Sequence, residues 1–148
     1  MMVVDEHLAL LALAGRPHPA LGTEPLALSY GRAYRLTRAL LDYGPGRLAL
    51  RGRFSRLVDL LAPADQRLLH DRLARPDPAV LSIIDPRPTI RTAGAIQNTY
   101  AVSLLQAETL AVSIVHDWRI VFIDGDSASD PFRRATTDLG LNLQILDE

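Results

Sequence analysis

The chain has 148 residues, 48% of them apolar, and a formal net charge of −1. This composition excludes a disordered chain, and the length fits one domain, residues 1–148, with a buried core. The absence of cysteine excludes disulfides and thiolate chemistry. Apolar runs such as residues 8–14 are too short to cross a bilayer, and no basic segment precedes them. We therefore expect a cytoplasmic protein with no signal peptide and no membrane contact.

The first elements predicted along the chain are a strand and a helix. Residues 2–4 form a short run rich in valine that ends at Asp5, which is typical of a buried strand. The leucines of residues 8–13 then predict a helix. Gly15 is the residue at which this helix should stop.

Helices are predicted through the middle of the chain. Apolar and aromatic positions over residues 26–41 predict one helix, which Gly-Pro-Gly at residues 44–46 should end. Residues 47–61 predict a second, amphipathic helix. Pro63 suits the first turn of a third helix, and residues 89–100 predict a fourth. The centre of the chain is interrupted by four prolines, Pro76, Pro78, Pro86 and Pro88.

The last third of the chain has the clearest pattern. Ser103 and Gln106 have the spacing of a capping box, which predicts a helix that begins there and runs to about His116. The apolar run at residues 120–123 predicts a strand covered on both faces. A helix over residues 131–140 and a strand over residues 143–146 should follow.

Strands separated by helices predict an α/β fold. Because helical segments lie between the strands, we expect a single domain with a mostly parallel sheet flanked by helices. The strands expected to pair in parallel are residues 2–5, 119–123 and 142–146.

Acidic residues follow the predicted strands, where parallel sheets place their sites. Asp5 ends the first strand, and Asp124 and Asp126 follow residues 120–123. Glu108 lies one turn into the helix that begins at Ser103. Carboxylates gathered in this way predict a site for Mg²⁺ or Mn²⁺. Such an ion could polarise a phosphodiester and activate a water molecule.

Each acid also has a structural interpretation. Asp5 could be the N-cap of the first helix, and Glu108 could be a solvated acid of a first helical turn. Asp124 and Asp126 flank Gly125 and could form a turn. The sequence leaves both interpretations open.

All 16 basic residues are arginines. Those between positions 32 and 57 are accompanied by a single acid, Asp42, and could bind phosphates. The alternatives are a solvated helix face or a surface for an acidic protein. Tyr30, Tyr34 and Arg35 could stack on bases, or be tyrosines at the edge of a core. The arginines of this cluster are Arg32, Arg35, Arg38, Arg47, Arg51, Arg53 and Arg56.

Three segments resemble the motifs of PIN-domain proteins. Val3-Val4-Asp5 before a leucine-rich helix resembles the family's opening motif. Residues 107–111 followed by residues 121–126 resemble its third and fourth acidic motifs. Residues 132–141 resemble its last helix and strand. The resemblance leaves about residues 45–100 unmatched.

This resemblance implies a function. It implies a metal-dependent ribonuclease. Many PIN-domain proteins are toxins of toxin–antitoxin pairs, so the resemblance also suggests an antitoxin protein as a partner. A homodimer is a further expectation. Its catalytic residues and Mg²⁺ or Mn²⁺ ligands would be Asp5, Glu108, Asp124 and Asp126. The RNA would meet Tyr30 and three arginines, Arg32, Arg35 and Arg38.

The second acidic motif of the family has no counterpart. Residues 29–36 contain tyrosines and arginines but no carboxylate, and neither Glu24 nor Asp42 is a convincing substitute. The alternative is therefore a catalytically degenerate PIN-like module that binds protein or nucleic acid without cleavage.

Overall fold

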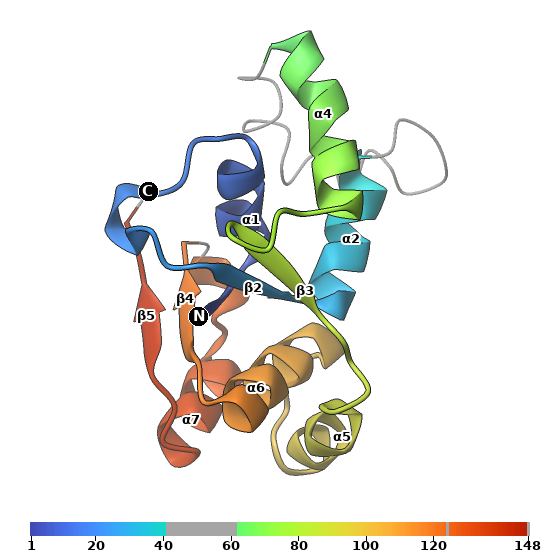
Figure 1. Cartoon of the computed structure of the whole chain (residues 1–148). Coiled ribbons are helices and arrows are strands. Elements are labelled where there is room, and N and C mark those ends of the chain that lie inside the picture. Colours follow the sequence, from blue (N-terminus) through green and yellow to red (C-terminus); the bar gives the residue numbers. More distant parts are fainter. Residues whose placement is uncertain (41–61, 124, 148) are drawn as a thin grey trace.

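In the computed structural model, the described residues 1–40, 62–123 and 125–147 form one sheet of five parallel strands in the order β3-β2-β1-β4-β5 (Figure 1). The strands are β1 (Met2–Val4), β2 (Leu26–Ser29), β3 (Leu81–Ile84), β4 (Arg119–Phe122) and β5 (Leu143–Ile145). Parallel pairing of β1 with β4, and of β4 with β5, confirms the predicted α/β fold.

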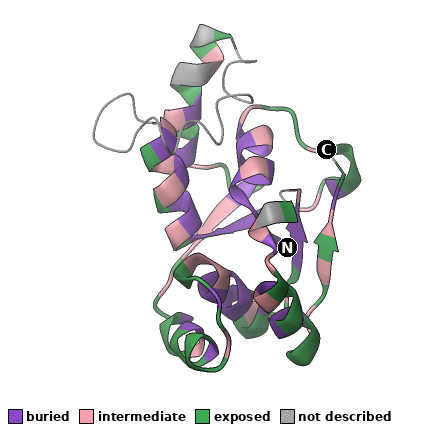
Figure 2. Cartoon of the chain, turned by 180° about the vertical axis from the view of Figure 1, so that it is seen from behind, coloured by how far each residue is buried: buried purple, intermediate pink, exposed green. Residues whose placement is uncertain are grey.

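Helices cover both faces of the sheet. One face packs against α1 (Glu6–Leu13), α2 (Tyr30–Leu40) and α4 (Pro63–Ala74). The other face packs against α5 (Ile90–Thr99), α6 (Leu104–His116) and α7 (Asp130–Asp138). The helices α2, α5, α6 and α7 bury the sides that face the sheet and have exposed residues on their opposite sides, whereas α1 has no exposed residue (Figure 2). Within the described ranges, no helix is long and apolar enough to span a bilayer.

The predicted helix over residues 26–41 is wrong for its first four residues. Residues 26–29 form β2, which lies between β1 and β3 and is buried along its whole length. The spacing of apolar residues suits a helix equally well. These residues are extended because strands pair with them on both sides, and because all four are buried in the sheet. The helix begins only at Tyr30.

The strand β3 has no counterpart among the predicted elements, because the surrounding prolines indicated an irregular centre. Leu81 is buried, and the strand pairs with β2 over four residues. The predicted helix over residues 47–61 and the turn at residues 44–46 lie outside the described residues.

Several predicted helix ends are confirmed. Gly15 follows α1 with a φ of 74°, and its amide donates to the carbonyl of Ala12. Gly140 follows α7 with a φ of 66°, and its amide donates to the carbonyl of Thr137. Glycine adopts this left-handed conformation without the steric cost of a Cβ atom.

Candidate functional site

The loops after β1, β2 and β4 meet at the carboxyl edge of the sheet. Asp5 and Glu6 follow β1 directly, Tyr30 begins α2 directly after β2, and Ile123 follows β4. The N-terminal part of α6 reaches this edge from the other face, because Glu108 bonds the start of α2 (Figure 1).

Asp5 is fully buried and joins two strand ends. Its Oδ1 accepts a hydrogen bond from the Leu8 amide at 2.9 Å, which makes Asp5 the N-cap of α1. Its Oδ2 accepts from the Ile123 amide at 2.8 Å. The structural interpretation of Asp5 is therefore confirmed, and its role as a metal ligand stays a prediction.

Glu108 binds the start of α2. Only 9% of this residue is exposed, and its two carboxylate oxygens accept from the Gly31 amide at 3.0 and 3.2 Å. A Cβ atom on Gly31 would lie 2.6 Å from Glu108 Oε2. Glycine at position 31 is therefore what allows this close approach. Glu108 is not the solvated acid that one interpretation of the sequence predicted.

Arg32 is a buried cation at this edge, only 2% exposed. Its Nη1 donates to Glu6 Oε2 at 2.6 Å, and its Nε donates to Thr109 Oγ1 at 2.9 Å. The guanidinium carbon lies 4.9 Å from the centre of the Phe122 ring. The guanidinium of Arg32 is enclosed and paired with Glu6, which argues against the predicted contact of Arg32 with RNA.

Glu6 is the residue of this site that sequence reasoning missed. It is buried, and its Oε1 lies 3.5 Å from Nη1 of Arg35 but accepts no hydrogen bond. The position of Glu6 beside Asp5, at the end of a predicted strand, could have indicated that it belongs to this site. Its partner Arg32 lies 26 positions away, and only folding brings the two together.

The outer face of α2 is aromatic. Tyr30 is 54% and Tyr34 59% exposed, and a spacing of four residues places them on the same side of the helix. Arg38 is exposed one turn further along, and Arg35 is half-buried against Glu6.

The end of β3 also carries an acid paired with an arginine. Asp85 follows β3, and Nε of Arg87 donates to its carboxylate at 2.9 and 3.0 Å. Hydrogen bonds from the side chain and then from the backbone amide of Arg87 lower the pKa of Asp85 to about 2.

The structure describes the side chains of only two of the four acids in the predicted cluster, Asp5 and Glu108. Asp124 and the side chain of Asp126 lie outside the described residues. Asp5 and Glu108 both reach the carboxyl edge, as predicted. Among the side chains that the structure describes, no three of His, Asp and Glu are grouped so that they could hold a metal ion.

The described residues alone do not complete a site for the divalent ion that the PIN resemblance implies. Magnesium requires several oxygen ligands in a nearly octahedral arrangement. The oxygens of Asp5 and Glu108 already accept backbone hydrogen bonds. The charge of Arg32 lies in the same region and would repel a second cation.

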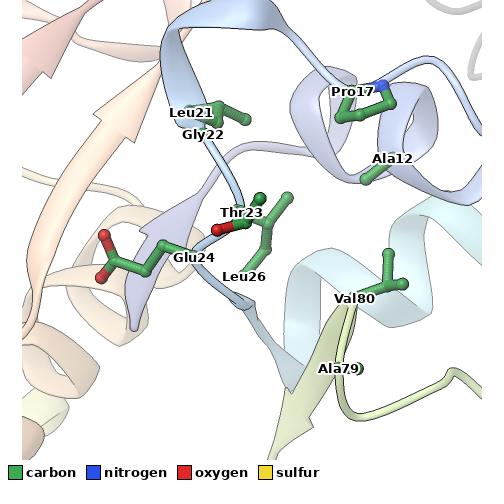
Figure 3. A pocket seen from close by; sticks show the side chains of 9 residues that line it. All are labelled: Ala12, Pro17, Leu21, Gly22, Thr23, Glu24, Leu26, Ala79 and Val80. Carbon is green, nitrogen blue, oxygen red and sulfur yellow. The ribbon is translucent and has the colours of Figure 1, made fainter.

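Two cavities lie at the opposite, amino edge of the sheet and share Ala12 and Val80 in their walls. Their volumes are about 220 and 380 Å³. The smaller is mostly apolar, and the carboxylate of Glu24 at its rim points away from the apolar side chains (Figure 3). Glu24 instead pairs with Arg119 at 3.0 Å. Neither cavity includes a residue of the predicted site.

No sequence profile of a protein family matches the chain, and no curated protein matches it.

Proposed function

We propose that this chain is a PIN-like module that binds single-stranded RNA without cleaving it. The observation that carries this proposal is the orientation of α2. Its inner face places the Arg32 guanidinium among the acids of the carboxyl edge, and its outer face exposes Tyr30 and Tyr34.

The inner face of α2 argues against hydrolysis. In the PIN resemblance, this stretch would supply the second acid of a metal site. It instead supplies a permanent cation, since arginine stays protonated in proteins. Arg32 pairs with Glu6 at 2.6 Å and so balances the charge of this one buried carboxylate without a divalent ion.

The outer face of α2 suits a single strand of RNA. Tyrosine rings stack on bases of any sequence, and each stacked base contributes about 1–3 kcal/mol. Two arginines of α2, Arg35 and Arg38, are not enclosed, and α2 contains no acid, so its outer side attracts phosphates. Because Arg32 is enclosed, we assign the phosphate contacts to Arg35 and Arg38.

A metal-dependent ribonuclease is the second candidate. The observation that favours it is that Asp5 and Glu108 reach the same edge of the sheet, where Asp124 and Asp126 follow β4 in the chain. A toxin held by an antitoxin protein would belong to this candidate.

Binding of a fluorescein-labelled oligouridine, followed by fluorescence anisotropy, tests the first candidate. Tyr30→Ala and Tyr34→Ala should each weaken binding by about 1–3 kcal/mol, roughly a 5- to 150-fold rise in Kd. The matched controls Tyr30→Phe and Tyr34→Phe keep the ring and should bind nearly as the wild type. Equal losses in the Ala and Phe variants would contradict stacking, and so would a wild type that does not bind.

The same RNA, incubated with millimolar Mg²⁺ or Mn²⁺, separates the two candidates. We expect it to remain intact. Cleavage by the wild type that is lost in Asp124→Asn would instead establish the ribonuclease. Asp124 is a better choice than Asp5 for this variant, because Asp5 also caps α1 and its substitution would change stability.

A further inference from the structure

Two arginines of α2 share the buried carboxylate of Glu6. Nη1 of Arg32 donates to Glu6 Oε2 at 2.6 Å, whereas Nη1 of Arg35 lies 3.5 Å from Glu6 Oε1. Two positive charges and one negative charge leave one surplus positive charge. We infer that Arg35 carries this surplus as a subsite for one phosphate of the RNA, and that the enclosed Arg32 keeps Arg35 available by neutralising Glu6. This inference rests on the proposed function and deepens it.

Burial decides which arginine pairs with the acid. The side chains of Arg32 and Glu6 are only 2% and 4% exposed, and a buried carboxylate is strongly destabilised unless a cation and hydrogen bonds accompany it. Arg32 meets this need at hydrogen-bond distance. Glu6 Oε1 accepts no hydrogen bond from any described residue, so Arg35 is the looser partner. The Arg35 side chain is 21% exposed, and an anion in solution can reach it.

The position of Arg35 suits a strand that stacks on the tyrosines. Arg35 directly follows Tyr34 in α2, and Tyr30 lies one turn before Tyr34. A guanidinium has five N–H donors in a fork that matches phosphate oxygens, so a loose contact with Glu6 leaves donors for a phosphate. An RNA whose bases stack on α2 therefore has a cation beside the tyrosines for its backbone.

The role of Arg32 becomes clear from the effect of removing it. Arg35 would then be the nearest cation to the buried carboxylate of Glu6, and a shift of less than about 1 Å would bring the two into hydrogen-bond distance. Arg35 would neutralise Glu6, and its charge would no longer attract phosphate. Methionine at position 32 would fill much of the space of the arginine. Thr109 Oγ1 would keep its hydrogen bond to the Leu105 carbonyl at 2.9 Å.

The dependence of oligouridine binding on NaCl concentration tests the inference. Each phosphate contact with a single strand contributes about 0.7 to the slope of log Kd against log salt. We expect Arg32→Met to lower this slope by about 0.7, although Arg32 is enclosed, and Arg35→Gln to lower it equally. The double variant Glu6→Gln with Arg32→Met removes the buried pair and should regain the wild-type slope, because Arg35 again has no buried charge to neutralise.

A matched pair of substitutions in the Arg32→Met background separates this mechanism from a simple loss of charge. Arg35→Gln should lower the slope no further there, because Arg35 already pairs with Glu6. Arg38→Gln is the control, and it should lower the slope by about 0.7 in the wild type and in Arg32→Met alike.

Thermal unfolding without RNA tests the same exchange of partners. In the wild type, Arg35→Gln should lower the Tm by less than about 4 °C, because a loose, partly exposed ion pair contributes little. In the Arg32→Met background, it should lower the Tm by about 6 °C or more, because Arg35 is then the partner of a buried carboxylate. Equal shifts in the two backgrounds would contradict the exchange. An Arg32→Met variant that does not fold, beside a double variant with Glu6→Gln that does, would contradict it too.

The outcomes distinguish this inference from the proposed function. A wild type that binds the oligouridine, with an unchanged slope in Arg32→Met, would overturn the inference alone. A slope that Arg35→Gln lowers further in Arg32→Met would do the same. A wild type that does not bind RNA, or that cleaves it, would overturn the proposed function and the phosphate subsite with it.

Discussion

Gly31 of α2 lies directly against the side chains of Glu108 and Leu105 of α6. In an isolated helix, glycine costs about 1 kcal/mol relative to alanine, so the sequence marks position 31 as a weak point. The structure gives the reason for it. The carboxylate of Glu108 bonds the Gly31 amide, and Leu105 packs beside it.

Replacing Gly31 by alanine should therefore destabilise the protein. The new Cβ would lie 2.6 Å from Glu108 Oε2 and 2.8 Å from Leu105 Cδ2, so both side chains would have to shift and Glu108 would lose its hydrogen bonds to the Gly31 amide. We expect a loss of about 1–3 kcal/mol in the free energy of unfolding, measured with urea. The control is Gly94→Ala in α5, where nothing lies within 4 Å and a gain of about 0.5–1 kcal/mol is expected. Equal effects of the two substitutions would contradict the close contact.

At the scale of the element, the start of α6 joins two helices. The capping box predicted from Ser103 and Gln106 is confirmed, with both reciprocal hydrogen bonds present. The Gln106 side chain also donates to the Ser127 carbonyl at 3.2 Å and to Ser129 Oγ at 3.0 Å. Since Ser129 is the N-cap of α7, one glutamine holds the beginnings of α6 and α7 together.

Substitutions in the capping box should separate the capping of α6 from its link to the start of α7. Ser103→Ala should lower the free energy of unfolding by about 0.5–2 kcal/mol, because it removes one cap. Gln106→Ala should cost more, because it removes the second half of the box and both bonds to the α7 side. Gln106→Glu keeps the acceptor of the box but loses the donor. Its free energy of unfolding should therefore lie between those of the wild type and Gln106→Ala. Urea unfolding measures all three, and a Gln106→Ala variant as stable as Ser103→Ala would contradict this account.

At the scale of the whole molecule, β1 lies in the middle of the sheet and contributes to both cores. Val4 packs in the core formed with α1, α2 and α4, and Val3 packs in the core formed with α5, α6 and α7. Successive side chains of a strand point to opposite faces, so one strand links the two cores.

The two faces should therefore unfold together. Fluorescence of the single tryptophan, Trp118, reports on the α6 face, and far-ultraviolet circular dichroism reports on all helices. We expect each of the substitutions Val3→Ala and Val4→Ala to lower the free energy of unfolding by about 1.5–3 kcal/mol. The midpoint of unfolding should shift equally in the fluorescence and the circular dichroism signals. Denaturation curves that differ between the two probes would show that the faces unfold independently.

The sequence by itself determined the elements that local signals define. The valine-rich run of β1, the apolar run of β4, the capping box of Ser103 and the stop at Gly15 each depend on neighbouring residues, and each was predicted correctly. With helices between the strands, parallel pairing follows from the geometry of the crossovers. The placement of Asp5 and Glu108 at one edge of the sheet also follows from this parallel arrangement.

Only the tertiary structure decided the extended form of residues 26–29 and the burial of Arg32. Residues 26–29 are a strand because β1 and β3 pair with them on both sides. Arg32 is enclosed because Glu6 and Thr109, 26 and 77 positions away, supply its hydrogen-bond acceptors. A local pattern cannot report partners so distant along the chain. A buried charge is stable only when folding brings such partners to it.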